Sequence, residues 1–179
     1  MLRPDPEPPI IQPLLPPEWK RVSLRNLPYH GRQLSYFAAR MSPSEPDARP
    51  SAREKSSSYP LHLYASAALK SANGTPVVAY TSDVTDRVGV INEALRIVAL
   101  DRSGELVICV GNTALETTIG ALELARVLGK GGQFSVQLYD SELGGWVDLQ
   151  VRDQAQLQRI VLNIETQGFR IVRLCAAKA

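Results

Sequence analysis

Hydrophobic positions become regular from about residue 75 onward, and their spacing predicts strands and helices in alternation. Residues 77–80 form a short apolar run that is typical of a strand. Across residues 83–99, apolar side chains recur at helical spacing and fall on one face, which predicts an amphipathic helix. Residues 105–110 form an apolar run without alternation, which favours a strand that is buried on both faces.

A second helix is expected to begin at Thr113. Thr113 and Glu116 have the spacing of a capping box, in which the hydroxyl accepts a hydrogen bond from the backbone N–H of Glu116 and the carboxylate reaches back. Leu115, Ile119 and Leu122 would then form the inward stripe of the helix. The cluster of glycines that follows would end it.

The C-terminal part of the chain predicts further strands. Residues 134–139 alternate as a strand does, and a turn at 140–145 leads to residues 146–149, which either extend the strand or form its hairpin partner. Residues 153–167 fit both a helix face and strand alternation, and helix is favoured because a glycine follows. Residues 169–175 predict the last strand. The expected order is β-α-β-α-β-(α)-β, an α+β fold with helices packed on one mixed sheet.

Composition divides the chain near residue 59. Eleven of the thirteen prolines lie in residues 1–50, and proline opposes both helix and sheet. Residues 42–58 have almost no apolar content and cannot offset the entropy of ordering by burial. We therefore expect a flexible, Pro-rich arm and linker over residues 1–58 and a globular domain over residues 59–179.

Charge is nearly balanced over the whole chain, with a net charge of +2, and gives no global signal for nucleic acid or an anionic membrane. The segment 19–40 is different, because it carries five cations, no acids and several aromatic rings. Its cations are Lys20, Arg21, Arg25, Arg32 and Arg40. They predict contacts to RNA phosphates, with the rings stacking on bases. Alternatively, the apolar residues of this segment dock on a partner or on the chain's own domain, and the cations are solvated.

The turn after Gly111 is a second candidate site. The start of a helix presents unpaired N–H groups that can bind an anion, and Asn112 and Thr113 would be the contact residues. However, the Glu116 carboxylate would itself lie near these N–H groups in the first turn of the helix, and no P-loop lysine follows. The favoured interpretation is therefore a tight strand-to-helix turn that has only a structural role. The alternative is a turn that contacts RNA.

Three further cations are candidate RNA contacts. Arg170 and Arg173 are three residues apart on the last predicted strand, so their side chains should lie on opposite faces. A solvated charge is the simpler explanation for both. Lys130 follows the second predicted helix, where a cation also interacts favourably with the helix dipole.

The sequence offers little for catalysis. Cys109 and Cys175 lie in apolar runs and are expected to be free thiols, and His30 and His62 are distant from both. No disulfide framework, zinc spacing or nucleophile elbow is present, so we expect no enzyme activity, no metal, no cofactor and no small-molecule substrate. No run of about 18 apolar residues predicts a membrane span, and we expect a soluble, intracellular protein.

The expected order of elements and several residues resemble the Alba superfamily over residues 75–175. The resemblance rests on the strand that ends at Gly111, on the apolar segment Thr117–Leu124, and on the Leu138–Trp146 region before a final apolar strand. Members of that family often carry a basic residue at the start of the first helix, where Arg87 stands here.

The resemblance implies a non-catalytic, RNA-binding subunit of an RNA-processing ribonucleoprotein of the ribonuclease P/MRP kind, which acts on tRNA and rRNA. It further implies binding to structured RNA, pairing with a second Alba-like chain, and a nuclear or nucleolar location. The alternative is a protein–protein interaction module that makes no direct contact with RNA.

Overall fold

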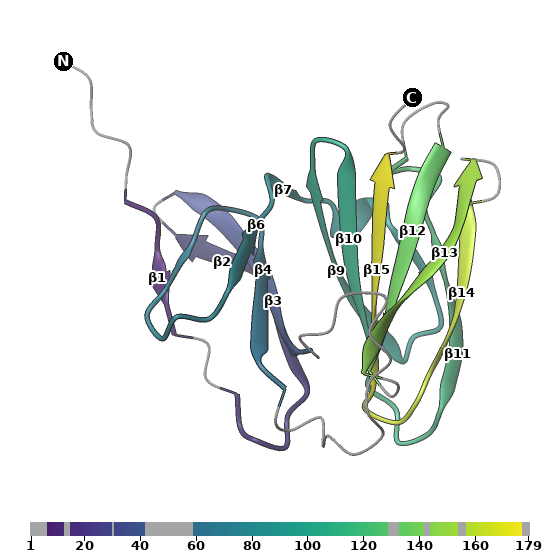
Figure 1. The fold of residues 1–179 in the computed structure, drawn as a ribbon, viewed down its shortest axis with the longest axis horizontal. Coiled ribbons are helices and arrows are strands. Elements are labelled where there is room, and N and C mark those ends of the chain that lie inside the picture. Colours follow the sequence, from purple (N-terminus) through teal and green to yellow (C-terminus); the bar gives the residue numbers. More distant parts are fainter. Residues whose placement is uncertain are drawn as a thin grey trace.

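A computed structural model of the chain describes residues 7–12, 15–29, 31–41, 59–128, 133–141, 144–153 and 157–176. These residues form three stacked β-sheets and a short two-stranded pair (Figure 1). A six-stranded sheet lies in the middle. A four-stranded sheet packs on one of its faces and a three-stranded sheet on the other, so that two separate hydrophobic cores lie against the central sheet.

The six-stranded sheet consists of β7 (Ser82–Asp83), β9 (Leu95–Arg102), β10 (Glu105–Asn112), β12 (Gln133–Asp140), β13 (Gly145–Asp153) and β15 (Phe169–Ala176). Neighbouring strands are antiparallel, and their order is β13-β12-β15-β10-β9-β7.

The two outer sheets are smaller. The four-stranded sheet has the order β2-β3-β4-β6, with β2 (Arg21–Tyr29), β3 (Arg32–Arg40), β4 (Leu61–Ala65) and β6 (Val77–Ala79). The three-stranded sheet has the order β14-β11-β8, with β14 (Arg159–Ile164), β11 (Thr118–Glu123) and β8 (Gly89–Ile91). The remaining elements are β1 (Ile10–Ile11), its parallel partner β5 (Lys70–Ser71), and the 3-10 helix η2 (Thr85–Arg87).

The central strand β10 is buried on both faces, which explains its unbroken apolar sequence. Leu106, Ile108 and Val110 belong to the core shared with the three-stranded sheet. Val107 and Cys109 point the other way and belong to the core shared with the four-stranded sheet. The strand predicted here is confirmed.

The basic and aromatic segment after residue 19 is part of the fold. Its strands β2 and β3 pair with each other, and β3 also pairs with β4. Phe37 of β3 stacks on Tyr64 of β4 with ring centroids 4.6 Å apart, and both rings pack against the central sheet. Docking of this segment on the chain's own sheets, one of the two alternatives above, is what the structure shows.

The predicted α+β fold is wrong. The described residues contain no α-helix, so the Alba-like order β-α-β-α-β-(α)-β and its packed helices are absent. Residues 83–99 form β7, η2, β8 and the start of β9 instead of a helix. Val84, Val88 and Leu95 are buried as the helical spacing predicted, but they enter the core from three separate short segments. The turn before β9 is stabilised by Asn92, whose side-chain oxygen accepts a hydrogen bond from Ala94 N at 2.9 Å.

The second predicted helix is also a strand. The Asn112 side chain accepts a hydrogen bond from Ala114 N at 2.8 Å, and such a local bond competes with helix initiation. The Thr113 hydroxyl donates to Ala94 O at 2.9 Å and forms no capping box. Leu115 and Ile119, expected to point inward, are 85% and 67% exposed.

The helix favoured for residues 153–167 is wrong, and the strand alternative is correct. In β14 the residues Ile160, Leu162 and Ile164 are buried and alternate with exposed positions. The strands predicted at 77–80, 134–139 and 169–175 are confirmed, and residues 146–149 belong to a hairpin partner, β13, of β12. The three confirmed strands are β6, β12 and β15.

Candidate functional site

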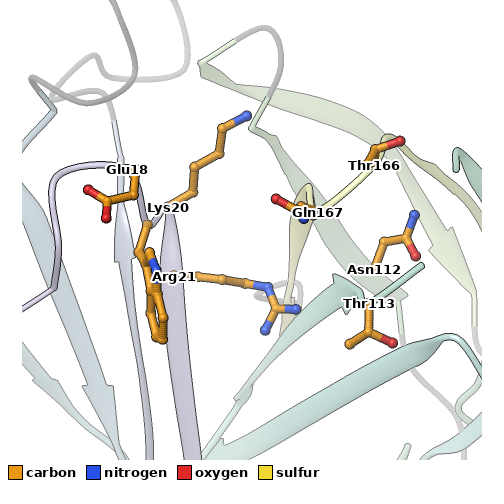
Figure 2. Close-up of a pocket in the computed structure, with 8 residues that line it drawn as sticks. Glu18, Lys20, Arg21, Asn112, Thr113, Thr166 and Gln167 are labelled. Atoms are coloured by element: carbon orange, nitrogen blue, oxygen red, sulfur yellow. The ribbon is translucent and has the colours of Figure 1, made fainter. Parts of the chain in front are cut away.

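A cleft of about 560 Å³ opens where the start of β2 faces the end of β10 and the turn between β14 and β15. Its lining comes from three distant parts of the sequence, and Figure 2 shows their side chains. The lining residues are Glu18, Trp19, Lys20, Arg21, Asn112, Thr113, Thr166 and Gln167. Two sites predicted separately, the basic segment and the Gly111 turn, therefore meet in one place.

Arg21 extends from β2 across this cleft toward the side that carries Asn112, Thr113 and Gln167 (Figure 2). Its guanidinium lies directly against the backbone of Gly111, where an added Cβ would be 1.8 Å from the guanidinium carbon. A side chain at position 111 would therefore force the Arg21 guanidinium to move. The Arg21 Nε atom is buried and has no hydrogen-bond partner among the described residues.

The Arg21 charge at the cleft has no counterion among the residues that the structure describes. No ion pair joins Arg21 to any carboxylate in the described part of the chain. A guanidinium has five N–H donors in a planar fork that matches a carboxylate or phosphate. Because Arg21 lines the cleft, an anion there can accept hydrogen bonds from the guanidinium.

Asn112 has a structural role in the cleft wall. Its side-chain amide donates to Glu116 O at 2.7 Å, Ile164 O at 3.1 Å and Glu165 O at 3.1 Å. These bonds, with the bond accepted from Ala114, tie the segment after β10 to the turn before β15. The amide of Asn112 therefore makes its hydrogen bonds within the protein. Its neighbour Thr113 also lines the cleft.

Gln167 has an unusual backbone conformation. Its φ is +55°, in the left-handed region, where residues other than glycine, asparagine and aspartate are uncommon. The turn is closed by a hydrogen bond from Gly168 N to Glu165 O at 2.9 Å. A residue held in this conformation stores backbone strain of order 1 kcal/mol, and such strain is concentrated at functional sites.

The other predicted contacts in the four-stranded sheet have partners inside the protein. Arg25 forms ion pairs of 3.1 Å with both Asp83 and Asp86. Burial alone would raise the pKa of the Asp83 carboxyl, but hydrogen bonds from Ser35, Thr85 and Arg25 lower it below its ordinary value.

Two more predicted arginines donate to backbone carbonyls. The Arg40 guanidinium donates to Leu15 O at 3.1 Å, Trp19 O at 3.2 Å and Tyr59 O at 3.5 Å, and so fixes the backbone near the cleft. Arg87 donates to Arg126 O at 2.8 Å. Arg32 is exposed and lies in a separate cavity, and Lys130 lies outside the described residues.

The two arginines of β15 have carboxylate partners. Arg170 is 7% exposed and pairs with Asp140 at 3.1 Å and Glu165 at 2.8 Å. Arg173, on the opposite face, pairs with Glu105 at 2.9 Å and is more exposed. Burial opposes ionisation of Glu165, yet hydrogen bonding from Ser141 and the charge of Arg170 hold its pKa below the ordinary value.

The buried thiol near the cleft has no acid–base role at neutral pH. Burial raises the pKa of Cys109 to about 11, although the nearby charge of Arg21 acts in the opposite direction. The group stays protonated and packs as a small hydrophobic side chain. Within the described residues no cluster of His, Cys, Asp and Glu has the arrangement of a metal site, and no helix there is long and apolar enough to span a bilayer.

Sequence reasoning named Lys20, Arg21, Asn112 and Thr113 but could not bring them together. It did not single out Glu18, Thr166 or Gln167 as part of a site. The only local signal was the Gln-Gly pair before the last strand, which indicates a turn. Their position at a cleft depends on how β2 packs against the ends of β10 and β15.

Comparison with known proteins gives no family for this chain. No family model matches it, and no curated protein is similar to it. Among solved structures, a β-L-arabinopyranosidase from Geobacillus stearothermophilus aligns with 49% of this chain and 19% of its own length, at 11% identity and a TM-score of 0.37. A xyloglucanase from Paenibacillus polymyxa aligns with 47% of this chain and 17% of its own length, at 12% identity and a TM-score of 0.34. These values are too low to assign a family or an activity.

Proposed function

We propose that this protein is a non-catalytic binding module whose cleft binds an anionic group through Arg21. The observation that carries the proposal is the Arg21 guanidinium, which is seated on Gly111 with a buried Nε that has no partner among the described residues. The Lys20 side chain lines the same cleft and adds a second positive charge. An anion there would gain charge-assisted hydrogen bonds, which are stronger than neutral ones.

Structured RNA, the ligand expected from the sequence, is one source of such an anion. That expectation came with an Alba-like fold, which this chain lacks, and with eleven candidate contacts. Seven of those contacts bond to groups of the protein itself, namely Arg25, Arg40, Arg87, Asn112, Thr113, Arg170 and Arg173. The remaining positive charge at the cleft supports binding of one anionic group more than binding of a long phosphate backbone.

The test is a titration of the full chain by calorimetry at low salt with three probes: inorganic phosphate, a structured RNA and an oligosaccharide of uronic acids. At least one probe should bind, and Arg21→Ala should weaken that binding at least tenfold. Gly111→Ala should weaken it similarly, because the added Cβ displaces the guanidinium while leaving the charge in the chain. Arg32→Ala, an exposed arginine outside this cleft, is the matched control and should bind as the wild type does.

Two results would overturn the proposal. One is that no anionic probe binds at low salt. The other is that Arg21→Ala and Arg32→Ala change the affinity by the same factor, which would make the binding a general effect of net charge.

A further inference from the structure

The cleft places hydrogen-bond acceptors beside its cations. The Glu18 carboxylate and the Gln167 amide line the same cleft as Lys20 and Arg21. A carboxylate only accepts hydrogen bonds, and an amide both accepts and donates. A bare phosphate offers these acceptors few hydroxyl donors, and its charge is repelled by the Glu18 carboxylate. A ligand that carries hydroxyl groups next to its anionic group would satisfy both kinds of residue.

Trp19 adds an apolar surface to this polar cleft. It is 53% exposed and is part of the lining. An exposed indole offers a flat apolar face and an N–H donor at its edge. A sugar ring has a matching form, because one face carries C–H groups and its rim carries hydroxyls.

Gln167 is a cleft residue in a strained backbone conformation. Of the three non-glycine residues with positive φ in the described part of the chain, the other two are Asn26 and Asn92, and asparagine tolerates this region comparatively well. Glycine would adopt the conformation of residue 167 without steric cost. Such strain is concentrated at functional sites, which favours a binding role for the Gln167 amide.

We propose that the ligand of the cleft is an acidic saccharide, in which Arg21 binds the carboxylate and Gln167 contacts a neighbouring hydroxyl and determines specificity. This inference rests on the proposed function of the Arg21 cleft and narrows its ligand class. A planar carboxylate fits the guanidinium fork. A polymer with a phosphate at every nucleotide would instead require a row of uncommitted cations, and the arginines Arg25, Arg170 and Arg173 are each paired with a carboxylate.

The experiment compares four probes on the full chain: oligomers of galacturonate and of glucuronate, the methyl esters of the same oligomers, a structured RNA and inorganic phosphate. At least one uronate oligomer should bind at least tenfold more tightly than phosphate or RNA, and its methyl ester should bind at least tenfold more weakly than the acid. Gln167→Gly should lower the affinity for the uronate about tenfold and leave the affinity for phosphate unchanged. Its thermal midpoint should be equal to or higher than that of the wild type, because glycine removes the strain.

The outcomes separate the two proposals. If RNA or phosphate binds more tightly than every uronate while Arg21→Ala still abolishes binding, the saccharide inference fails and the anion-binding function stands. If Gln167→Gly binds the uronate as well as the wild type does, the role of Gln167 fails. If the methyl esters bind as well as the acids and Arg21→Ala has no effect, the proposed function itself fails.

Discussion

Two arginines flank the turn between β14 and β15, and their surroundings are opposite. Arg170 is buried and pairs with Asp140 and Glu165. Arg21 enters from β2, and no carboxylate among the described residues pairs with it. The charge of Arg170 is neutralised by these two carboxylates, and the ion pairs stabilise the turn. Arg21 lines a cleft and makes no ion pair within the described part of the chain, which favours binding of an anion from outside.

The comparison teaches that the presence of a basic residue is a weak indicator of a binding site. A cation whose hydrogen bonds are satisfied within the fold gains little from a ligand, because the ligand must displace existing partners. A cation that is positioned by packing alone keeps all of its N–H groups available for hydrogen bonds to a ligand. Arg21 packs against Gly111 and has no ion pair with the described residues, and this distinguishes it from Arg25 and Arg170.

The largest effect on stability is expected for Arg170→Ala. Removing the guanidinium leaves Asp140 and Glu165 without this partner, and breaking a buried ion pair costs about 3–5 kcal/mol. Denaturant unfolding measures this loss. The matched control is Arg173→Ala on the same strand, whose more exposed pair with Glu105 should be worth about 1 kcal/mol or less. Equal losses in the two variants would contradict the distinction drawn here.

The next effect is a loss of stability in acid. Burial opposes ionisation of Glu165, Glu105 and Asp83, but their hydrogen bonds and arginine partners lower the pKa of each carboxyl below its ordinary value. Since a lowered folded pKa contributes stability above the unfolded pKa, that contribution is complete above about pH 4–4.5 and is lost as the pH falls through the lower folded values.

Unfolding free energies measured from pH 6 to pH 2 test this expectation. The drop below about pH 4 should be smaller in Glu165→Gln, because one of the responsible carboxyls is gone. A profile that is flat down to pH 2 would show that these carboxyls are not selectively stabilised in the folded protein.

A smaller loss is expected for Arg40→Ala. Its guanidinium donates to three backbone carbonyls, and the loss of these bonds should cost about 1–2 kcal/mol. Because Trp19 O is one of the acceptors, this variant should also loosen the backbone beside the cleft. Amide hydrogen exchange of residues 18–21 measures this, and unchanged protection there would contradict the anchoring role.

The smallest effect is expected for Arg21→Ala. The guanidinium makes no ion pair with the described residues, so its removal should change the free energy of unfolding by about 0.5 kcal/mol or less. The same substitution is expected to abolish most anion binding. A stability loss of several kcal/mol, measured as for Arg170→Ala, would show that Arg21 is a structural residue.

The sequence predicted several strands well and the helices poorly. The apolar run of β10, the alternation of β12 and the final strand β15 were evident because apolar and β-branched residues in such short segments favour strands. The helical spacing over residues 83–99 was misleading. Most of its apolar residues are buried in short segments of different sheets, whereas Ile91 is 41% exposed. Local spacing does not specify which sheet a residue enters.

The candidate site was predicted in parts. Arg21 and Lys20 were selected by charge, and Asn112 and Thr113 by the glycine turn, although the structure gives the Asn112 side chain a structural role. Gln167 was missed because its left-handed φ is set by the turn that joins two sheets. Nothing in the sequence around residue 167 distinguishes it from an ordinary surface glutamine.

The sequence by itself determined the residues available to the protein: an apolar central strand, a basic segment without acids and a glycine at position 111. Only the tertiary structure decided that Arg170 is paired with carboxylates, whereas Arg21 makes no ion pair with the described residues. The physical reason is that ion pairing depends on distances of 3–4 Å between side chains that are distant in sequence. Those distances are fixed only when the three sheets pack together.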